Sequence, residues 1–307
     1  MSSLPREYSV VIYGAGNYYG RLMSHLNHID NVKIVDVVTT DETIYKVVDG
    51  YIIHSIKSVI EKQFDYIIIA AEKWKELYDV CIQIGIDEKK IILSSVFDRA
   101  YFNFDKYIRL KNNPPSIIAN TCLGGCVYKE LGLEHFSPTI NMFCMGEDYL
   151  KFICDLNKYL TAEMNTYTPA VKSGYTRDCF IPQGKLVDTT WYFNHSVDCC
   201  ESVNEWNRKR SRVNYDNLFF LMVCYTEEEA IRFDSLELPH KMGFYYKDLG
   251  LKNIVYVPEW NDGNTRAHYK YDWMAFINHI STGIFEYPGK INWLSFFCDS
   301  KISIRYS

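Results

Sequence analysis

The chain has 307 residues, of which 48% are hydrophobic and 23% are charged, and its formal net charge is −5. This length predicts two domains, and the hydrophobic content excludes a disordered chain. The negative net charge gives the protein no overall positive potential that would attract nucleic acid. No apolar run approaches the roughly 18 residues of a membrane span. Because the N-terminus lacks a basic region followed by an apolar signal core, we expect a cytoplasmic protein.

The ten cysteines are scattered along the chain and do not have the spacing of a metal site. Cys122 and Cys126 are four positions apart and Cys199 and Cys200 are adjacent, so neither pair forms a Cys-x-x-Cys motif. We therefore expect reduced thiols that mostly behave as small buried hydrophobic groups. The sequence predicts no metal site, and it names no cofactor with certainty.

The first third of the chain alternates predicted strands and helices. Tyr8–Tyr13 is a β-rich run that enters a glycine turn, and an amphipathic helix follows at about 18–27. The glycines permit a tight turn and a close approach of the backbone to a ligand, and the helix N-terminus attracts phosphate. The spacing Gly-x-Gly-x-x-x-Gly is a weaker variant of the dinucleotide fingerprint.

A second predicted strand, 33–38, leads to Asp41, near the position where dinucleotide binders hold the ribose with an acidic residue. Asp36 is expected inside the strand. The next expected elements are a helix at 55–62 capped by Ser55, a strand at 65–70, a helix at 74–84 and a strand at 90–93. This alternation predicts a parallel, doubly wound sheet. The candidate cofactor-binding residues are Gly14, Gly16, Asn17, Gly20 and Asp41.

This region resembles the small Rossmann-like domains of bacterial surface-sugar biosynthesis proteins. The resemblance lies in the segments YSVVIYGAGNYYG, KIVDVVTTDE, FDYIIIAAEKW and IGIDEKKIILSS. Some domains of this kind bind a sugar nucleotide, and many have lost their ligand. The resemblance implies a nucleotide-binding or sugar-nucleotide-binding type of domain over residues 1–111. Use of NAD is a less favoured alternative, and a domain that serves only as a scaffold is another.

A connecting helix is expected at 97–110, and the prolines at 114 and 115 prevent its continuation. We place the domain boundary between residues 111 and 112. The second domain then opens with a strand at 116–119, a polar turn, a short helix at 128–131 and a further strand. Ligands of open α/β sheets bind beyond the carboxyl ends of strands, so this turn is our preferred centre of function.

The rest of the second domain continues as an α/β pattern. Asn194 and His195 follow a predicted strand, and Thr226 begins a capping box. The expected elements are a helix at 149–160, an irregular segment or hairpin at 161–184, a strand at 185–193, a helix at 198–213, a strand at 218–224, a helix from 227 to about 234, a strand at 252–257 and a closing helix in the aromatic tail.

The second domain is similar to a bacterial domain-of-unknown-function family that is associated with exopolysaccharide biosynthesis. The resemblance covers nearly two thirds of the chain and lies in SIIANTCLGGCVYKELGLEHFSPTINMF and VDTTWYFNHSVDCCESVNEWNRKRSRVNYDNLFFLM. It implies membership but carries no established chemistry. Where the family tends to have Tyr-x-Ser after the histidine, Ser196 follows His195 directly, which leaves the role of His195 open. The positions that match the family pattern are Asn120, Cys122, Tyr128, Ser137, Pro138, Thr139, Phe193, His195, Trp206, Arg212, Asn214, Asp216 and Asn217.

Three sets of polar residues are expected to converge beyond strand ends: Asn120 with Cys122, His195 with Asn194, and Asp216 with Arg212. Glycosyl transfer needs a base for the acceptor hydroxyl and positive charge for the leaving diphosphate. The candidate bases are His195, Glu130 and His135. The candidate substrate-binding residues are Asn120, Cys122, Gly124, Gly125, Ser137, Arg208, Arg212, Asn214 and Asp216.

Each of these assignments has an alternative. The cations from Arg208 to Arg212 are either a phosphate clamp or a solvated helix face. Cys122 is either a buried structural thiol or, with His195 or His135, a nucleophile and its base.

The absence of any Asp-x-Asp pair from the sequence disfavours a metal-bound sugar diphosphate. We therefore expect two Rossmann-like three-layer α/β domains in tandem, with mainly parallel sheets, that form a metal-independent, glycosyltransferase-like transferase. Its partners would be a nucleotide sugar and a glycan acceptor of surface-polysaccharide biosynthesis. The alternatives are a non-catalytic sugar-nucleotide-binding or regulatory protein and, third, an NAD-dependent oxidoreductase. The sequence leaves open whether the chain forms a homo-oligomer.

Overall fold

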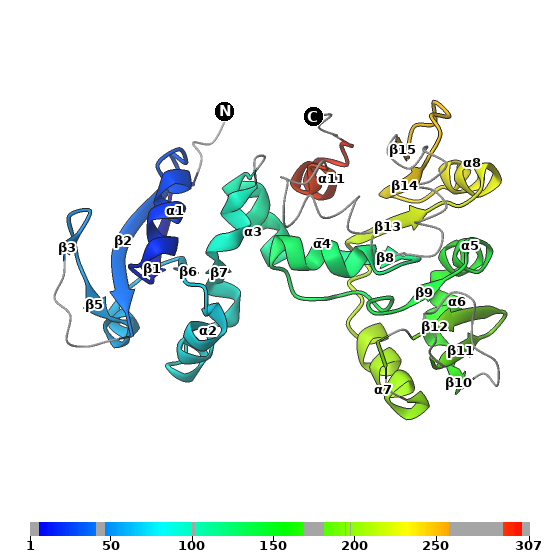
Figure 1. Cartoon of the computed structure of the whole chain (residues 1–307), viewed down its shortest axis with the longest axis horizontal. Coiled ribbons are helices and arrows are strands. Elements are labelled where there is room, and N and C mark those ends of the chain that lie inside the picture. Colours follow the sequence, from blue (N-terminus) through cyan, green and yellow to red (C-terminus); the bar gives the residue numbers. More distant parts are fainter. Residues whose placement is uncertain are drawn as a thin grey trace. The chain divides into compact units, whose positions relative to one another are not determined.

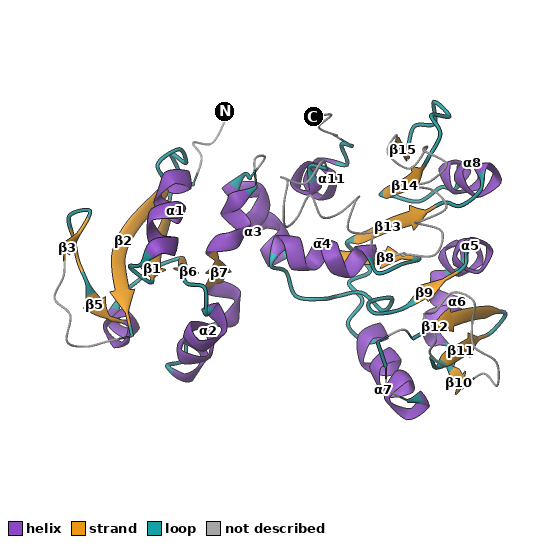
Figure 2. Ribbon diagram, in the orientation of Figure 1, coloured by secondary structure: helices purple, strands orange, loops and turns teal. Residues whose placement is uncertain are grey.

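The computed structural model describes residues 6–40, 47–99, 102–168, 181–193, 195–196, 198–257 and 291–302. The chain divides into two compact units, Met1–Asn112 and Asn113–Ser307. Helices and four sheets are present in the described residues (Figures 1 and 2), and most of the strands belong to the two parallel sheets. The expected mixed α/β class with mainly parallel sheets is confirmed. In the described part of the chain, no helix is long and apolar enough to cross a membrane.

The first unit is built on a five-stranded parallel sheet in the order β5-β2-β1-β6-β7. Its central strand β1 pairs with β2 on one side and with β6 on the other. The chain therefore builds the sheet outward from β1, first to one side and then to the other. The strands are β1 (Tyr8–Tyr13), β2 (Val32–Thr39), β5 (His54–Ser55), β6 (Tyr66–Ile69) and β7 (Ile91–Leu93), and β3 (Val47–Val48) and β4 (Tyr51–Ile52) form a separate hairpin.

The helices of the first unit bury apolar faces against this sheet, whose strands β1 and β6 are almost wholly buried. The expected helix at 97–110 begins only at Phe104, because residues 94–98 form a 3₁₀ turn. The rings of Tyr8 and Tyr66 pack against Phe104, with centroids 5.1 and 6.1 Å from it. The helices are α1 (Asn17–Leu26), α2 (Trp74–Gln83) and α3 (Phe104–Asn112), and the 3₁₀ helices are η1 (Ile56–Glu61), η2 (Glu88–Lys90) and η3 (Ser94–Asp98).

Asp65 fastens the beginning of β6 to β1. Its carboxylate accepts hydrogen bonds from the N–H and the hydroxyl of Ser9, at 2.8 and 2.9 Å, and pairs with Arg6 at 2.7 Å. Burial acts to raise the pKa of Asp65, but the bonds from Ser9 and the charge of Arg6 outweigh it, so the pKa is lowered. The folded unit therefore favours the ionised carboxylate.

The second unit contains a four-stranded parallel sheet in the order β15-β14-β13-β8. Its strands are β8 (Ser116–Ala119), β13 (Leu218–Val223), β14 (Lys241–Tyr245) and β15 (Ile254–Tyr256). The strand β14 was not expected from the sequence. Gly243 weakens its strand signal, yet a Cβ there would lie 2.5 Å from Ile254 and 3.1 Å from Phe233, so close packing requires the glycine.

A second sheet in this unit is antiparallel, and the sequence analysis anticipated only a hairpin at 161–184 as one of two alternatives. Its order is β10-β11-β12-β9, with strands β9 (Phe143–Cys144), β10 (Asn165–Tyr167), β11 (Gln183–Leu186) and β12 (Thr189–Tyr192). The single strand expected at 185–193 is wrong, because the chain reverses at Val187 and Asp188. Val187 has a φ of 57°, which a β-branched residue rarely adopts, so the sequence carries no turn signal.

The helices of the second unit follow the expected pattern with two differences. The helix expected at 128–131 already begins at Leu123. The helix expected at 149–160 is two helices, because Asp155 leaves helical geometry and its carboxylate accepts from the N–H of Lys158. The capping box is confirmed: Thr226 Oγ1 accepts from the N–H of Glu229. The helices are α4 (Leu123–Leu131), α5 (Gly146–Cys154), α6 (Leu156–Thr161), α7 (Cys199–Arg210), α8 (Glu227–Ser235) and α11 (Trp293–Asp299).

Candidate functional site

A thiol and an imidazole meet in the second unit, beyond the end of β8. Cys122 Sγ lies 3.9 Å from Nε2 of His195, within hydrogen-bond distance for sulfur. Cys122 is half-buried and His195 is exposed. Two of the three polar sets therefore come together through these side chains, although Asn194 lies outside the described residues. Within the described part, the hydroxyl of Ser196, beside His195, is buried and has no hydrogen-bond partner.

The short strand β9 brings these two loops together. The N–H of Cys144, in β9, donates to the carbonyl oxygen of Asn120 at 3.1 Å, just after β8 ends. On its other side β9 pairs with β12, where Trp191 lies opposite Cys144. The rings of Phe143 and Tyr192 stack across this pair at 4.6 Å. Since His195 lies three residues beyond the end of β12, this pairing places its side chain near Cys122.

Asn120 holds the turn that carries Cys122. Its side chain is fully buried, donating to the carbonyl of Val223 at 3.0 Å and accepting from the N–H of Val223 at 2.9 Å. These bonds extend the backbone pairing of β8 and β13 past the end of β8. The side-chain amide of Asn120, which was expected to bind substrate, is thus hydrogen-bonded to the backbone instead.

The amino end of α4 begins at Cys122 and favours negative charge. Cys122 is the N-cap residue, but its side chain makes no capping hydrogen bond, and the first turn of α4 contains no acidic residue. By contrast, the first turn of α8 contains three glutamates. Because helix N-termini carry partial positive charge, α4 favours an anion at its amino end more than α8 does.

Gly124 and Gly125, which were expected in the turn, lie in the first turn of α4 and have different surroundings. A Cβ at Gly124 would lie 3.3 Å from Ile117, so the glycine lets α4 pack closely on β8. A Cβ at Gly125 would make only ordinary contact, at 3.7 Å, with Ile140. Packing therefore explains Gly124 but does not require Gly125.

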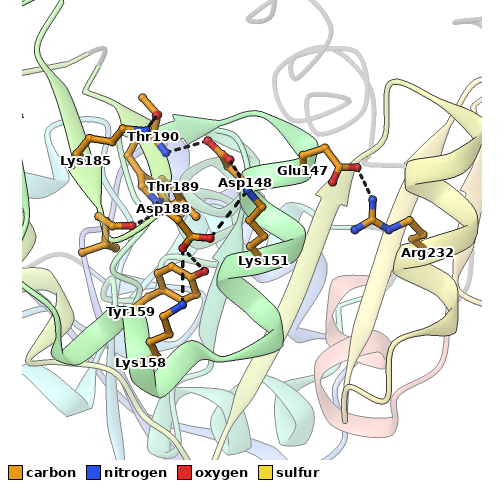
Figure 3. A network of polar contacts seen from close by, with 12 residues as sticks. Glu147, Asp148, Lys151, Lys158, Tyr159, Lys185, Asp188, Thr189, Thr190 and Arg232 are labelled. Atoms are coloured by element: carbon orange, nitrogen blue, oxygen red, sulfur yellow. Dashed lines mark hydrogen bonds and ion pairs between the residues drawn. The ribbon is translucent and has the colours of Figure 1, made fainter.

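A network of polar contacts holds the hairpin of β11 and β12 against α5 and α6 (Figure 3). The N–H of Thr190 donates to Asp148 at 2.8 Å, and the hydroxyl of Tyr159 donates to Asp188 at 2.8 Å. Lys158 lies 3.7 Å from the same carboxylate. The bond from Tyr159, followed by weaker charge effects, lowers the pKa of Asp188. This network fixes the strand that precedes His195.

The third polar set, Asp216 with Arg212, lies at the opposite side of the parallel sheet, where the strands begin; we call this side the amino edge. Leu218 pairs with Ser116, so residues that precede β13 lie beside the start of β8. Asn214 donates from its side chain to Asn113 and from its N–H to Ser116, at 2.9 and 2.7 Å. Asp216 is exposed at this edge. The expected convergence with Cys122 is wrong for this set, because parallel strands place their preceding residues at the amino edge.

Arg212 is also held at this amino edge. Its guanidinium pairs with Glu134 and lies over the ring of Phe136, 5.4 Å from the centroid. The ring of His135 lies 5.2 Å from that of Tyr128. Desolvation, followed by the charges of nearby arginine and lysine residues, lowers the pKa of His135, which favours the neutral imidazole.

Glu130 and Ser137 do not join the Cys122 site either. Glu130 is 3% exposed on α4, eight positions after Cys122, which is about 12 Å along the helix axis. Ser137 is buried, and its Oγ lies 3.2 Å from Oγ1 of Thr139. Thr139 in turn accepts from the N–H of Ala119, so this segment fastens the free edge of β8.

The cations near the end of α7 divide into two kinds. Lys209 is buried and donates to the carbonyl of Ile140 at 2.9 Å and to Glu205 at 2.6 Å. Arg210 donates to the backbone carbonyls of Leu160 and Ala162, at 3.0 and 2.6 Å, at the carboxyl end of α6. Arg208 is exposed. Most of these cations therefore stabilise the fold through hydrogen bonds. Neither of the two expected alternatives, a phosphate clamp or a solvated helix face, describes the whole set.

The glycine turn of the first unit leaves space at the amino end of α1. Gly14 has a φ of 119°, its N–H donates to Val38 at 2.9 Å, and a Cβ would clash with the carbonyl of Ala70. A Cβ at Gly16, the N-cap residue, or at Gly20 would meet no atom within 4 Å. Gly20 therefore does not serve the close helix packing of the third fingerprint glycine.

Asn17 is exposed as the first residue of α1, whose first turn contains no acidic residue. Asp41 lies outside the described residues. Asp36 lies inside β2, as expected, where its buried carboxylate accepts from Lys62 at 2.5 Å and lies 3.1 Å from Nδ1 of His54. Asp36 is thus occupied by its own ion pair.

Two family models match the chain. The model described as "Domain of unknown function (DUF1919)" matches residues 93–294, and the model described as "C2185-like, N-terminal" matches residues 6–92. An uncharacterized protein of Haemophilus influenzae is 26% identical over 207 residues, which are 61% of this chain and 97% of that protein. The relative therefore consists almost entirely of the matched segment. None of these descriptions names an activity.

Proposed function

The chain belongs to the DUF1919 family, and we propose that it is a cytoplasmic, metal-independent, glycosyltransferase-like transferase that uses a nucleotide-activated sugar. The observation that carries this proposal is the pair formed by Cys122 and His195, 3.9 Å apart beyond the carboxyl end of β8. Ligands of open parallel sheets bind at this edge. The assignment to surface-polysaccharide biosynthesis rests on the sequence resemblance alone.

His195 is the proposed general base, because it is exposed and can accept the proton of an acceptor hydroxyl. The leaving diphosphate needs positive charge, and the amino end of α4 offers it through its backbone N–H groups. Binding of the diphosphate was expected of Arg212, but Arg212 lies at the amino edge of the sheet, away from Cys122. The proposal therefore moves the phosphate site from arginine side chains to a helix terminus.

The first unit supplies a second nucleotide site in this proposal. Two features support this: its parallel sheet has β1 between β2 and β6, and the space beside Gly16 lies at a helix N-terminus without a side-chain cap. These features also support the alternative, a non-catalytic protein that binds a sugar nucleotide. The two functions differ in whether His195 contributes to turnover.

A thermal-shift panel of nucleotide sugars, NAD and CoA tests the proposal, followed by assay of nucleoside diphosphate release. We expect a nucleotide sugar to raise the melting temperature. Replacing His195 with asparagine should leave this shift unchanged and slow release roughly 100-fold or more, since general bases contribute that much. Stabilisation by NAD alone contradicts the transferase, and binding without turnover supports the alternative.

A further inference from the structure

Cys122 differs from the other cysteines of the described chain. Burial raises the pKa of the buried thiols Cys81, to about 12, and Cys224, which keeps them protonated. Cys154 and Cys200 are exposed on the surface. Cys122 is half-buried and has an imidazole nitrogen 3.9 Å from its sulfur. It is therefore accessible, held in place and beside a base.

The position of this thiol is that of a nucleophile. Thiolate is the reactive form of cysteine, and both a neighbouring histidine and a helix N-terminus stabilise it. Cys122 has both, since it is the N-cap residue of the nine-residue helix α4. Hydrogen bonds hold the turn in place: Asn120 is bonded to β13, and the N–H of Leu123 donates to Thr121 Oγ1 at 3.3 Å.

We propose that Cys122 is a nucleophile with His195 as its base, and that the pair transfers acyl groups from a thioester to a hydroxyl. A thioester suits the site because its carbonyl oxygen becomes an anion on attack, and the amino end of α4, where Cys122 is the N-cap residue, favours negative charge. The capture of the acyl group is independent of the proposed sugar transfer. Only the acceptor, a hydroxyl of the bound sugar, rests on that proposed function.

The reaction balances within the pair. The proton of the Cys122 thiol moves to Nε2 of His195, and the thiolate attacks the carbonyl carbon of the thioester. The carbon–sulfur bond of the donor breaks, and the leaving thiolate takes the proton from His195. The acceptor hydroxyl then gives its proton to His195 and attacks the acyl carbon. The bond to Cys122 breaks, and its thiolate regains the proton, so nothing is oxidised or reduced.

Alkylation by iodoacetamide at pH 7, followed by mass mapping of peptides, tests the activation of the thiol. Cys200 serves as the exposed internal reference. We expect Cys122 to react about ten times faster than Cys200 although it is less exposed, because reactivity follows thiolate content. Replacing His195 with glutamine should bring the rate of Cys122 down to that of Cys200. Equal rates in the unmodified chain would overturn the proposal.

Incubation with acetyl-CoA tests the acyl transfer itself. We expect intact-protein mass spectrometry to show one acetyl group, which peptide mapping assigns to Cys122 and which Cys122→Ala abolishes. A melting temperature equal to that of the unmodified chain would show that the variant is folded. An acetyl group that persists in Cys122→Ala, or none in the unmodified chain, contradicts this inference. The thermal shift with nucleotide sugars is scored separately, so its failure would count against the proposed function alone.

Discussion

Replacing Asn120 with alanine should destabilise the second unit rather than remove a substrate contact. The side chain of Asn120 is fully buried, and its amide bonds both backbone groups of Val223, at 3.0 and 2.9 Å. Alanine cannot replace either bond. The substitution leaves one N–H and one C=O without partners at the end of β13, in the interior of the unit.

The expected loss follows from these two groups. A buried backbone group that loses its partner costs about 1–2 kcal/mol, so the two together cost about 3 kcal/mol. For a unit of this size, with a urea m-value of about 3 kcal/mol per molar, the midpoint of unfolding should fall by about 1 M. The m-value itself should not change.

Urea unfolding followed by tryptophan fluorescence is the assay. Trp191, Trp206 and Trp293 are fully buried in the second unit, and Trp74 of the first unit is already 42% exposed, so the change in fluorescence mainly follows the second unit. Asn207→Ala is the control, because Asn207 is exposed on α7 and its loss should change stability by less than about 0.5 kcal/mol. An unchanged midpoint for Asn120→Ala, with loss of nucleotide-sugar binding, would refute the reasoning and make Asn120 a ligand contact.

Three further predictions concern packing, pH and charge. Gly14→Ala should destabilise the first unit by at least about 2 kcal/mol, because the φ of Gly14 is 119° and a Cβ would clash. Gly20→Ala should instead stabilise the helix by up to about 1 kcal/mol, and calorimetry compares the two variants. Asp65→Asn should cost about 1 kcal/mol at pH 7. Because the pKa of Asp65 is lowered in the folded protein, this stabilisation is present above about pH 4 and is lost as the pH falls through the lowered pKa. The urea midpoints of the unmodified chain and of Asp65→Asn should therefore converge in acid. Lys209→Met should cost about 1–2 kcal/mol through its lost bond to a buried carbonyl, while Arg208→Ala should stay within about 0.5 kcal/mol in the same assay.

The sequence predicts those parts of the fold whose signal is local. The strands β1, β8 and β13 are buried apolar runs, and the structure places each within a residue of the expected bounds. The strand β14 was missed because Lys241 and Gly243 interrupt its pattern. Lys241 is buried because its ammonium donates to carbonyls at the end of α8, including that of Phe233 at 3.0 Å. Such a tertiary contact leaves no periodicity in the sequence.

The candidate site was predictable only in part. Cys122 and His195 could each be placed after a strand, but their contact depends on β9, which has two residues and pairs through its backbone. The sequence predicts a further strand here, but backbone bonds require no particular side chain, so it does not show which strands β9 pairs with. Arg212 and Asp216 were assigned to the same site because the sequence does not show which end of a neighbouring strand they flank.

One comparison tests the location of the reacting centre most directly. It measures how fast His195→Asn and Arg212→Ala release nucleoside diphosphate from the nucleotide sugar that stabilises the protein most. The carboxyl edge of β8 holds His195 beside Cys122, and the amino edge holds Arg212 against Glu134. We expect His195→Asn to slow release roughly 100-fold or more and Arg212→Ala to leave it unchanged. The opposite result, a slow Arg212→Ala and an unaffected His195→Asn, would place the centre at the amino edge and contradict the account.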